Sequence, residues 1–239
     1  MREFSLLVGF GASLGLLRVF LLVPIWQAPK WLNAGLVTLS GCLIGARLAY
    51  VAPNWGYFDD QLLEVPQFWL GGLSWVGAVT GGLLVMLLIS HFRPIPLGKL
   101  ADMLVLMIPP LGVSIWLGCW VAGIAYGPLA SEGALWGIPA RDEFGVLMPR
   151  FPLQLLASAS LLVYCLLVEK KLLQVKRTGQ AAVLMFIGLA GNMLLFTFLR
   201  SDPAPEWYGL RQDAWAAAFF FGISLVSMIV FYVRPLRAR

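Results

Sequence analysis

Two arginines stand in surroundings that are almost entirely apolar. Arg47 lies in the run LIGARLAYV with Tyr50 one helical turn away, and Arg200 closes another apolar run, two residues before Asp202. A guanidinium in hydrocarbon costs roughly 3 kcal/mol even on a lenient insertion scale, so it normally faces water, a cavity or a partner. For Arg47, snorkelling to the headgroups, pairing with an acid and binding a ligand all stay open.

The stretch WLGGLSWVGAVTGGLL, residues 69–84, raises a second chemical question because it carries glycines inside an apolar run. Gly77 and Gly81, four residues apart, are typical of membrane helices that approach each other closely. The pair Gly71–Gly72 instead predicts a break in the helix, or a backbone that closely approaches a ligand.

The elements that position these residues are membrane-spanning helices. Hydrophobic residues make up 60% of the 239 residues, charged residues 12%, and the mean hydropathy is +0.83. A span needs about 20 mostly apolar residues, and the first run is longer than the ~7–15 residues of a signal-peptide core, so we expect it to be an uncleaved helix. The sequence predicts an all-α integral membrane protein, a single polytopic domain over residues 1–239, with seven spans at residues 4–25, 32–53, 67–91, 101–127, 152–168, 181–199 and 214–232.

The basic residues predict the orientation of these spans. With the N-terminus outside, ten of the 17 Lys and Arg fall on inner connections, five on outer connections and two, Arg18 and Arg47, within spans. Because cytoplasmic loops are enriched in Lys and Arg, we expect the N-terminus outside and the C-terminus in the cytoplasm. Polar and backbone-exposing features then converge toward the outer leaflet, where we expect a lipid cavity.

At the opposite, inner side the polar residues have simpler interpretations. We expect Arg18 to snorkel and His91 to be a solvated flank. Asp102 is expected to cap the fourth span, although a functional role stays open. Pro109–Pro110 predicts an interruption of the fourth span.

Several classes of chemistry are disfavoured. Cys42, Cys119 and Cys165 fall inside predicted spans, so they are expected to pack as small apolar groups rather than form disulfides. One histidine, His91, cannot build a histidine-rich metal site. The net charge of +5 comes from basic residues scattered between the spans, so no nucleic-acid partner is expected. The sequence also predicts no metal and no cofactor.

The connection at residues 128–151 mixes apolar and charged residues, including Trp136, Phe144, Asp142 and Glu143. Amphipathic segments settle at the headgroup boundary. We expect an interfacial arm over the mouth of the cavity; a flexible surface loop is the alternative.

In sequence order, six segments resemble motifs of the prolipoprotein diacylglyceryl transferase family. IGARLAYV is similar to GGRxGYV, and WLGGLSWVGAVTGG is similar to GGMSFHGGLxGG. The fourth span resembles DFxAPxxPxGLGxGRxGNFINGExxG, with matches at Asp102, Pro109, Gly118, Gly123 and Gly127. FPLQLL resembles HPSQLYE, FLRSDP resembles FxRxPD, and LRQDAW keeps the glutamine of MGQ.

This resemblance implies a plasma-membrane enzyme that moves diacylglycerol from phosphatidylglycerol to the lipobox cysteine of a prolipoprotein. Phosphatidylglycerol, the lipobox peptide and membrane lipids are the implied partners. The residues carried over for the lipid are Arg47, Gly71, Gly72, Ser74, Gln154, Arg200 and Gln212. If the chemistry persists, the candidates for proton transfer are Tyr50, Tyr126 or Asp202.

The chain departs from the family pattern at six positions that the family fills with polar residues. Val76 stands at the histidine of SFHGG, and the others are Trp116, Cys119, Ile124, Met193 and Thr197. Valine cannot accept a proton. We therefore consider a transferase with a remodelled site, a non-catalytic relative that binds a lipid or a lipoprotein, and, last, a small-molecule transporter with broken helices.

Overall fold

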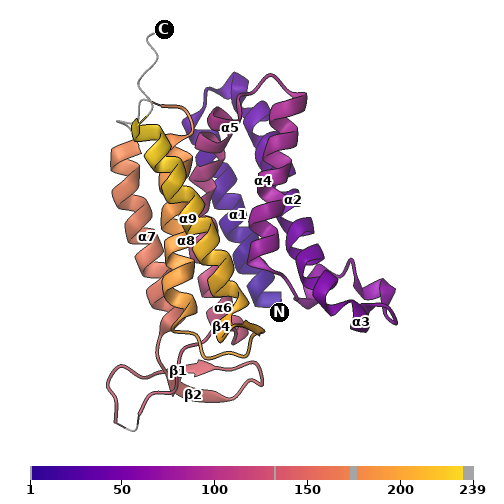
Figure 1. Cartoon of the computed structure of the whole chain (residues 1–239), viewed down its shortest axis with the longest axis vertical. Helices are drawn as coiled ribbons and strands as arrows, with labels where there is room; N and C mark the ends of the chain where they lie inside the picture. Colours follow the sequence, from indigo (N-terminus) through magenta and orange to yellow (C-terminus); the bar gives the residue numbers. More distant parts are fainter. Residues whose placement is uncertain (1, 132, 173–176, 234–239) are drawn as a thin grey trace.

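A computed structural model describes residues 2–131, 133–172 and 177–233, and its core is a bundle of long helices (Figure 1). The helices are α1 (Arg2–Leu22), α2 (Ala28–Val51), α4 (Trp75–Phe92), α5 (Leu97–Leu104), α6 (Ile108–Ala122), α7 (Leu153–Leu172), α8 (Gln180–Thr197) and α9 (Gln212–Val233). Within the described residues, six stretches are long and apolar enough to cross a membrane, and Leu153–Glu169 is a shorter apolar helix. The predicted helical, multi-pass membrane protein is confirmed.

Neighbouring helices pack in pairs, and one pair meets at the glycines that the sequence singled out. α2 packs along α4, α1 along α6, and α8 along α9. A Cβ atom on Gly77 would lie 2.2 Å from the carbonyl oxygen of Gly45, and one on Gly81 would lie 2.3 Å from that of Gly41. The close approach of two membrane helices at Gly77 and Gly81 is therefore confirmed.

Buried side chains form two cores. One lies among α6, α7 and α8 and includes Trp116, Leu161 and Met185. The other joins α1, α2 and α5 around Trp31 and Leu100. Many other large apolar side chains on the helices are exposed, as expected of surfaces that face lipid.

Two predicted helices are shorter than expected at their ends. The span predicted to begin at residue 67 begins at Trp75, because Gly71 and Gly72 adopt positive φ values of 98° and 67° and Ser74 caps the helix. The span predicted for residues 101–127 is divided into α5, the 3-10 segment Val105–Met107 and α6, and it ends before Gly123. Pro109 and Pro110 lie in the first turn of α6, so the predicted interruption is confirmed just ahead of them.

The connections contain structure that the all-α prediction lacked. Short helical turns occupy η1 (Ile25–Gln27), η2 (Ala52–Asn54), α3 (Trp55–Phe58), η3 (Leu62–Glu64) and η4 (Phe68–Leu70). Two antiparallel hairpins follow, β1 (Ile138–Arg141) with β2 (Leu147–Arg150), and β3 (Glu206–Trp207) with β4 (Leu210–Arg211). Figure 1 shows both hairpins, α3 and the start of α1 at one end of the bundle.

Two polar residues have partners that the sequence did not reveal. Asp102 accepts hydrogen bonds from the backbone nitrogens of Gly179 (2.6 Å) and Ala182 (2.9 Å), so it caps α8 rather than its own helix. Arg18 forms an ion pair with Glu169 of α7 instead of snorkelling alone. Both contacts join segments that are far apart in the sequence, which periodicity within one helix cannot predict.

Candidate active site

The residues that the sequence singled out fall into two groups at one end of the bundle. Arg47, Tyr50, Gly71, Gly72 and Ser74 come together where α2 meets the start of α4. Their proximity follows from the break in the chain, which turns the segment before α4 back onto α2, and the backbone nitrogen of Ser74 donates to the carbonyl of Ala46 at 3.0 Å.

Arg47 is the centre of this first group. Its side chain donates to four backbone carbonyls: Nε to Val65 (2.8 Å), Nη1 to Gly71 (2.6 Å) and Gly72 (3.2 Å), and Nη2 to Glu64 (2.6 Å). Only 8% of the residue is exposed. Four of the five N–H groups of the guanidinium are thus bonded to the protein, and a phosphate held by two parallel hydrogen bonds would have to displace at least one of these carbonyls.

Gly72 provides the close approach that its sequence position predicts, but to protein groups. A Cβ atom on Gly72 would lie 2.4 Å from Cε1 of Tyr50 and 2.8 Å from Nη1 of Arg47. The Tyr50 ring lies 5.8 Å from the centre of the Arg47 guanidinium. A side chain at position 72 would therefore displace Tyr50 or Arg47.

A second group surrounds Arg200, after α8. Arg200 donates from Nε and Nη2 to the two carboxylate oxygens of Asp202, at 2.8 and 2.5 Å, and from Nη1 to Asp213 at 3.2 Å. Arg211 also bonds to Asp202 and lies 3.7 Å from the Asp213 carboxylate. These four residues form a charge-balanced quartet, in which Arg200 uses three of its five N–H groups.

The sequence analysis missed Arg211 and Asp213 as members of the quartet. A tight turn at Tyr208–Gly209, where φ is 52° and 75°, brings the chain back past Asp202 and so places Arg211 and Asp213 beside it. The glycine of this turn is the sequence feature that could have revealed them. Burial opposes the charge of Arg200, but hydrogen bonding and attraction to Asp202 and Asp213 outweigh it and raise the pKa of Arg200.

Tyr126 lies next to this quartet. The carbonyl of Tyr126 accepts a hydrogen bond from the backbone nitrogen of Ser201 at 2.9 Å. The Tyr126 ring lies 4.2 Å from the guanidinium of Arg150, a buried residue that the sequence analysis did not single out and that also pairs with Asp142 at 3.2 Å. Burial, followed by a hydrogen bond to Glu143, raises the pKa of Tyr126 to about 12.

Gln154 and Gln212 lie at the starts of helices, and each donates a hydrogen bond to a backbone carbonyl. Gln154, only 1% exposed, donates from Nε2 to the carbonyl of Ile124 at 3.0 Å. The backbone nitrogen of Gln212 donates to the carbonyl of Pro205 at 3.0 Å, at the start of α9. Both residues stabilise turns around the second group.

Comparison with known proteins identifies the family. Residues 1–230 match the family described as prolipoprotein diacylglyceryl transferase. The chain belongs to this family. A phosphatidylglycerol–prolipoprotein diacylglyceryl transferase of Rhodospirillum rubrum is 28% identical over 207 residues, which are 81% of this chain and 71% of the relative. One of the same name from Methylocella silvestris is 27% identical over 205 residues, 81% of this chain and 67% of the relative.

Of the six positions that depart from the diacylglyceryl transferase pattern, Trp116 and Thr197 are buried and the other four are half-buried. Trp116 donates from Nε1 to Oδ1 of Asn192 at 3.0 Å, and Asn192 donates from Nδ2 to the carbonyl of Ala157 and the hydroxyl of Ser160. The hydroxyl of Thr197 donates to the carbonyl of Met193 at 2.7 Å. These contacts satisfy polar groups within the bundle.

Val76 lies in the first turn of α4, two residues after the Ser74 cap. It is half-buried and follows Trp75, whose ring lies 5.8 Å from that of Phe220 on α9. An apolar residue therefore stands in the first turn of α4, where the family pattern has a histidine.

Proposed function

We propose that this protein carries out the diacylglyceryl transfer of its family, from phosphatidylglycerol to the thiol of a lipobox cysteine. The observation that carries the proposal is membership of the family over residues 1–230, together with the names of relatives that span most of the chain. In this reaction the thiol sulfur forms a bond to the glycerol carbon that carries the phosphate. The bond from that carbon to the phosphate oxygen breaks, glycerol phosphate leaves, and the thiol proton passes to a base or to water.

Arg200 is the better candidate of the two carried-over arginines for holding the phosphate. It retains two N–H groups that are not bonded within the quartet, whereas Arg47 retains one. Arginine suits a phosphate because its planar fork can donate two parallel hydrogen bonds. We assign Arg47, with Gly71, Gly72 and Ser74, to shaping the neighbouring wall, and Gln154 and Gln212 to supporting the second group.

The proton acceptor is assigned to Asp202. With a pKa of about 12, the phenol of Tyr126 keeps its proton at neutral pH and is suited to donating a hydrogen bond. Asp202 is a carboxylate whose oxygens already accept hydrogen bonds from Arg200 and Arg211. Because a well-placed base contributes about 10²–10⁴-fold, turnover should be slower than in a relative with a histidine at position 76.

A second candidate function, lipid binding without turnover, is favoured by Val76 and by the buried bond between Trp116 and Asn192. These residues place apolar or internally satisfied groups where the family pattern has polar ones. Such a protein would retain phosphatidylglycerol or a lipoprotein without breaking a bond.

One experiment separates the two functions. Purified protein in phosphatidylglycerol vesicles is incubated with a lipobox peptide, and the thioether product is measured by mass spectrometry together with released glycerol phosphate. Product that is lost in Arg200→Lys, while Arg141→Lys on the exposed surface of β1 retains it, supports transfer. Absence of product from folded, lipid-bound protein, at excess enzyme, would establish binding without turnover.

A further inference from the structure

The segment that follows α2 forms a rigid lateral projection, which we call the elbow (residues 55–70). It contains α3, η3 and η4, and Figure 1 shows it extending sideways from the end of the bundle. The four bonds from Arg47 reach carbonyls at both its second half and the glycines that follow it. The buried Phe58 ring also lies 5.2 Å from the Arg47 guanidinium. The elbow is therefore fixed to α2.

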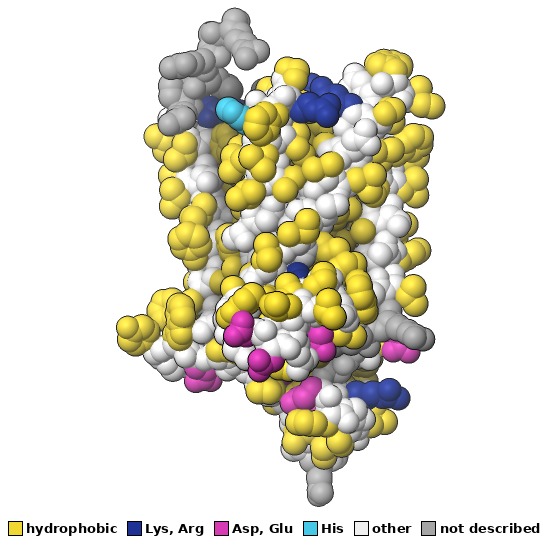
Figure 2. Space-filling model, turned by 90° about the vertical axis from the view of Figure 1, so that its right-hand side faces the viewer, with side chains coloured by type: hydrophobic (Ala, Val, Ile, Leu, Met, Phe, Trp, Pro, Cys, Tyr) yellow, Lys and Arg dark blue, Asp and Glu magenta, His cyan; other side chains and the backbone are white. Residues whose placement is uncertain are grey.

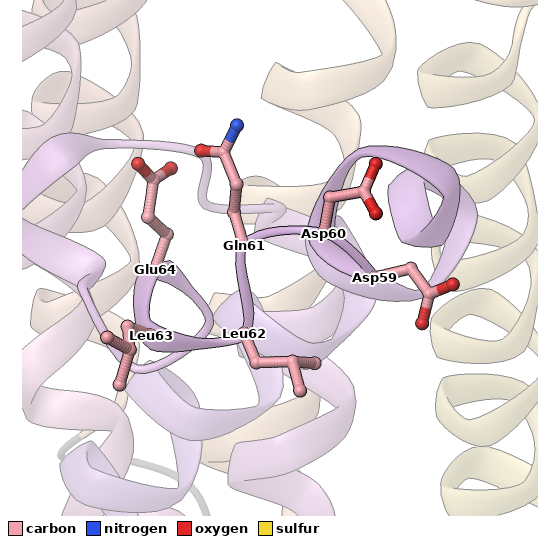
Figure 3. Close-up of a pocket in the computed structure, with 6 residues that line it drawn as sticks. All are labelled: Asp59, Asp60, Gln61, Leu62, Leu63 and Glu64. Atoms are coloured by element: carbon pink, nitrogen blue, oxygen red, sulfur yellow. The ribbon is translucent and has the colours of Figure 1, made fainter.

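The elbow has two chemically different sides. In Figure 3 the Glu64 carboxylate and the Gln61 amide point to one side of the chain, and the side chains of Leu62 and Leu63 point to the other. Leu63 is 84% exposed. All six residues from Asp59 to Glu64 line one open hollow at this loop. An exposed leucine pair opposite carboxylates is the arrangement of a segment that lies at a boundary between lipid and water.

The apolar side continues a surface that already faces lipid. The helical run Ile25–Phe58 is 34 residues long, which is more than the ~20 residues that cross the hydrocarbon, so part of it lies at or beyond the interface. Ile44 and Leu48, exposed on α2, are followed by the exposed Trp55 and Tyr57. Tryptophan and tyrosine concentrate at the level of the lipid headgroups.

The charge pattern indicates which side meets the lipid. Figure 2 shows acidic side chains gathered at this end of the bundle, beyond a band of hydrophobic ones. Lipid phosphates repel carboxylates, so the carboxylate side must face water and the leucine side the bilayer.

From these observations we infer that the elbow is a membrane-surface element. Leu62, Leu63 and the neighbouring aromatic rings insert into the headgroup region of the bilayer, and Asp59, Asp60 and Glu64 remain in water. The occupant of the exposed apolar side is thus membrane lipid, and the inference does not depend on whether the protein transfers diacylglycerol.

Matched cysteine variants test the inference. Leu63→Cys and Asp60→Cys are prepared in the full chain, reconstituted into lipid nanodiscs of phosphatidylcholine and phosphatidylglycerol, and labelled with a water-soluble maleimide. Both sites are exposed, and a thermal melt checks that each variant is folded. The wild-type protein, whose Cys42, Cys119 and Cys165 lie on helices, provides the blank.

A thiol at position 63 should react roughly tenfold more slowly than one at position 60, because a rise of about one unit in its pKa removes about tenfold of its thiolate. A fluorophore at position 63 should also be quenched by brominated lipids. Equal labelling rates, or slow labelling of both variants, overturns the inference. Protection of Leu63→Cys only after a lipobox peptide is added also overturns it, and would assign the apolar side to the peptide.

Discussion

The indole nitrogen of Trp116 lies 3.0 Å from the amide oxygen of Asn192, and this bond joins α6 to α8 in the middle of the bundle. Asn192 uses its two N–H groups as well, toward Ala157 and Ser160 on α7. Three helices thus meet at one satisfied amide. Because a buried polar group is costly when unpaired, this bond is part of what sets the register of α6, α7 and α8.

Replacement of Trp116 by Phe should lower the free energy of unfolding by about 1–3 kcal/mol, because the Asn192 oxygen loses its donor in a buried site. The measurement is unfolding in mixed micelles, followed by circular dichroism. Trp31→Phe is the matched control, since Trp31 is equally buried but its indole nitrogen makes a long contact, 3.4 Å, to Gln27. An equal loss of stability in both variants would show that ring packing, not the bond to Asn192, is what matters.

Arg47→Lys should loosen the elbow although it preserves the charge. An ammonium cannot span the carbonyls of Glu64, Val65, Gly71 and Gly72 in the fixed geometry of a guanidinium. We expect proteolysis within residues 55–72 to become faster, and fluorescence from a probe at position 63 to lose its quenching by lipid. Unchanged proteolysis, with phosphatidylglycerol binding abolished, would instead identify Arg47 as a direct ligand of the lipid.

The sequence was sufficient for the helices but not for the bonds between them. Length and hydropathy predicted the apolar runs, and Gly71–Gly72 predicted the break before α4, because these properties are local. The partners of Arg47, Arg18 and Asp102 lie 17 or more residues away, so no helical period reveals them. None of the three interpretations of Arg47 was the one that the structure shows, which is hydrogen bonding to backbone carbonyls. The broken segment before α4 supplies backbone acceptors, and the pattern of side chains in the sequence does not reveal them.

Gly72→Ala should destabilise the same region through a different cause. The residue has a φ of 67°, which costs an alanine roughly 1–2 kcal/mol, and the new Cβ atom would overlap Tyr50. A thermal melt measures the loss. Gly56→Ala provides the control because no atom lies within 4 Å of a Cβ atom there. If Tyr50→Ala does not recover part of the loss in the double variant, overlap with Tyr50 is not a cause.

Asp202→Asn should lower the thermal stability of the protein, although Asp202 lies outside both hydrophobic cores. The change leaves Arg200 and Arg211 with Asp213 as the remaining carboxylate of the quartet, and removing a charge-assisted bond costs about 1.5–3 kcal/mol. Thermal unfolding measures the loss, and Glu206→Gln, an exposed carboxylate on the adjacent β3, should leave the melting temperature unchanged. A smaller effect in Asp202→Asn than in Glu206→Gln would contradict a structural role for the quartet.

Tyr126 provides a prediction about alkaline pH. Its pKa is raised to about 12 in the folded protein, first by burial and then by the hydrogen bond to Glu143, from an ordinary value of 10.0. The folded state therefore holds the phenolic proton more tightly than the unfolded state does, and this contribution to stability is complete below pH 10 and is lost as the pH rises toward 12. Phenolate absorbance is titrated in the wild type and in Tyr126→Phe. The transition that the variant lacks should be the one nearest pH 12 in the wild type.

Glu143→Gln supplies the second half of that test. It removes the charge and keeps a hydrogen-bond acceptor, so the transition of Tyr126 should move toward its ordinary pKa without reaching it, because burial remains. A transition that stays in place would assign the whole shift to burial. If the missing transition lies near the ordinary value in the wild type, neither burial nor Glu143 raises the pKa of Tyr126, and the prediction is wrong.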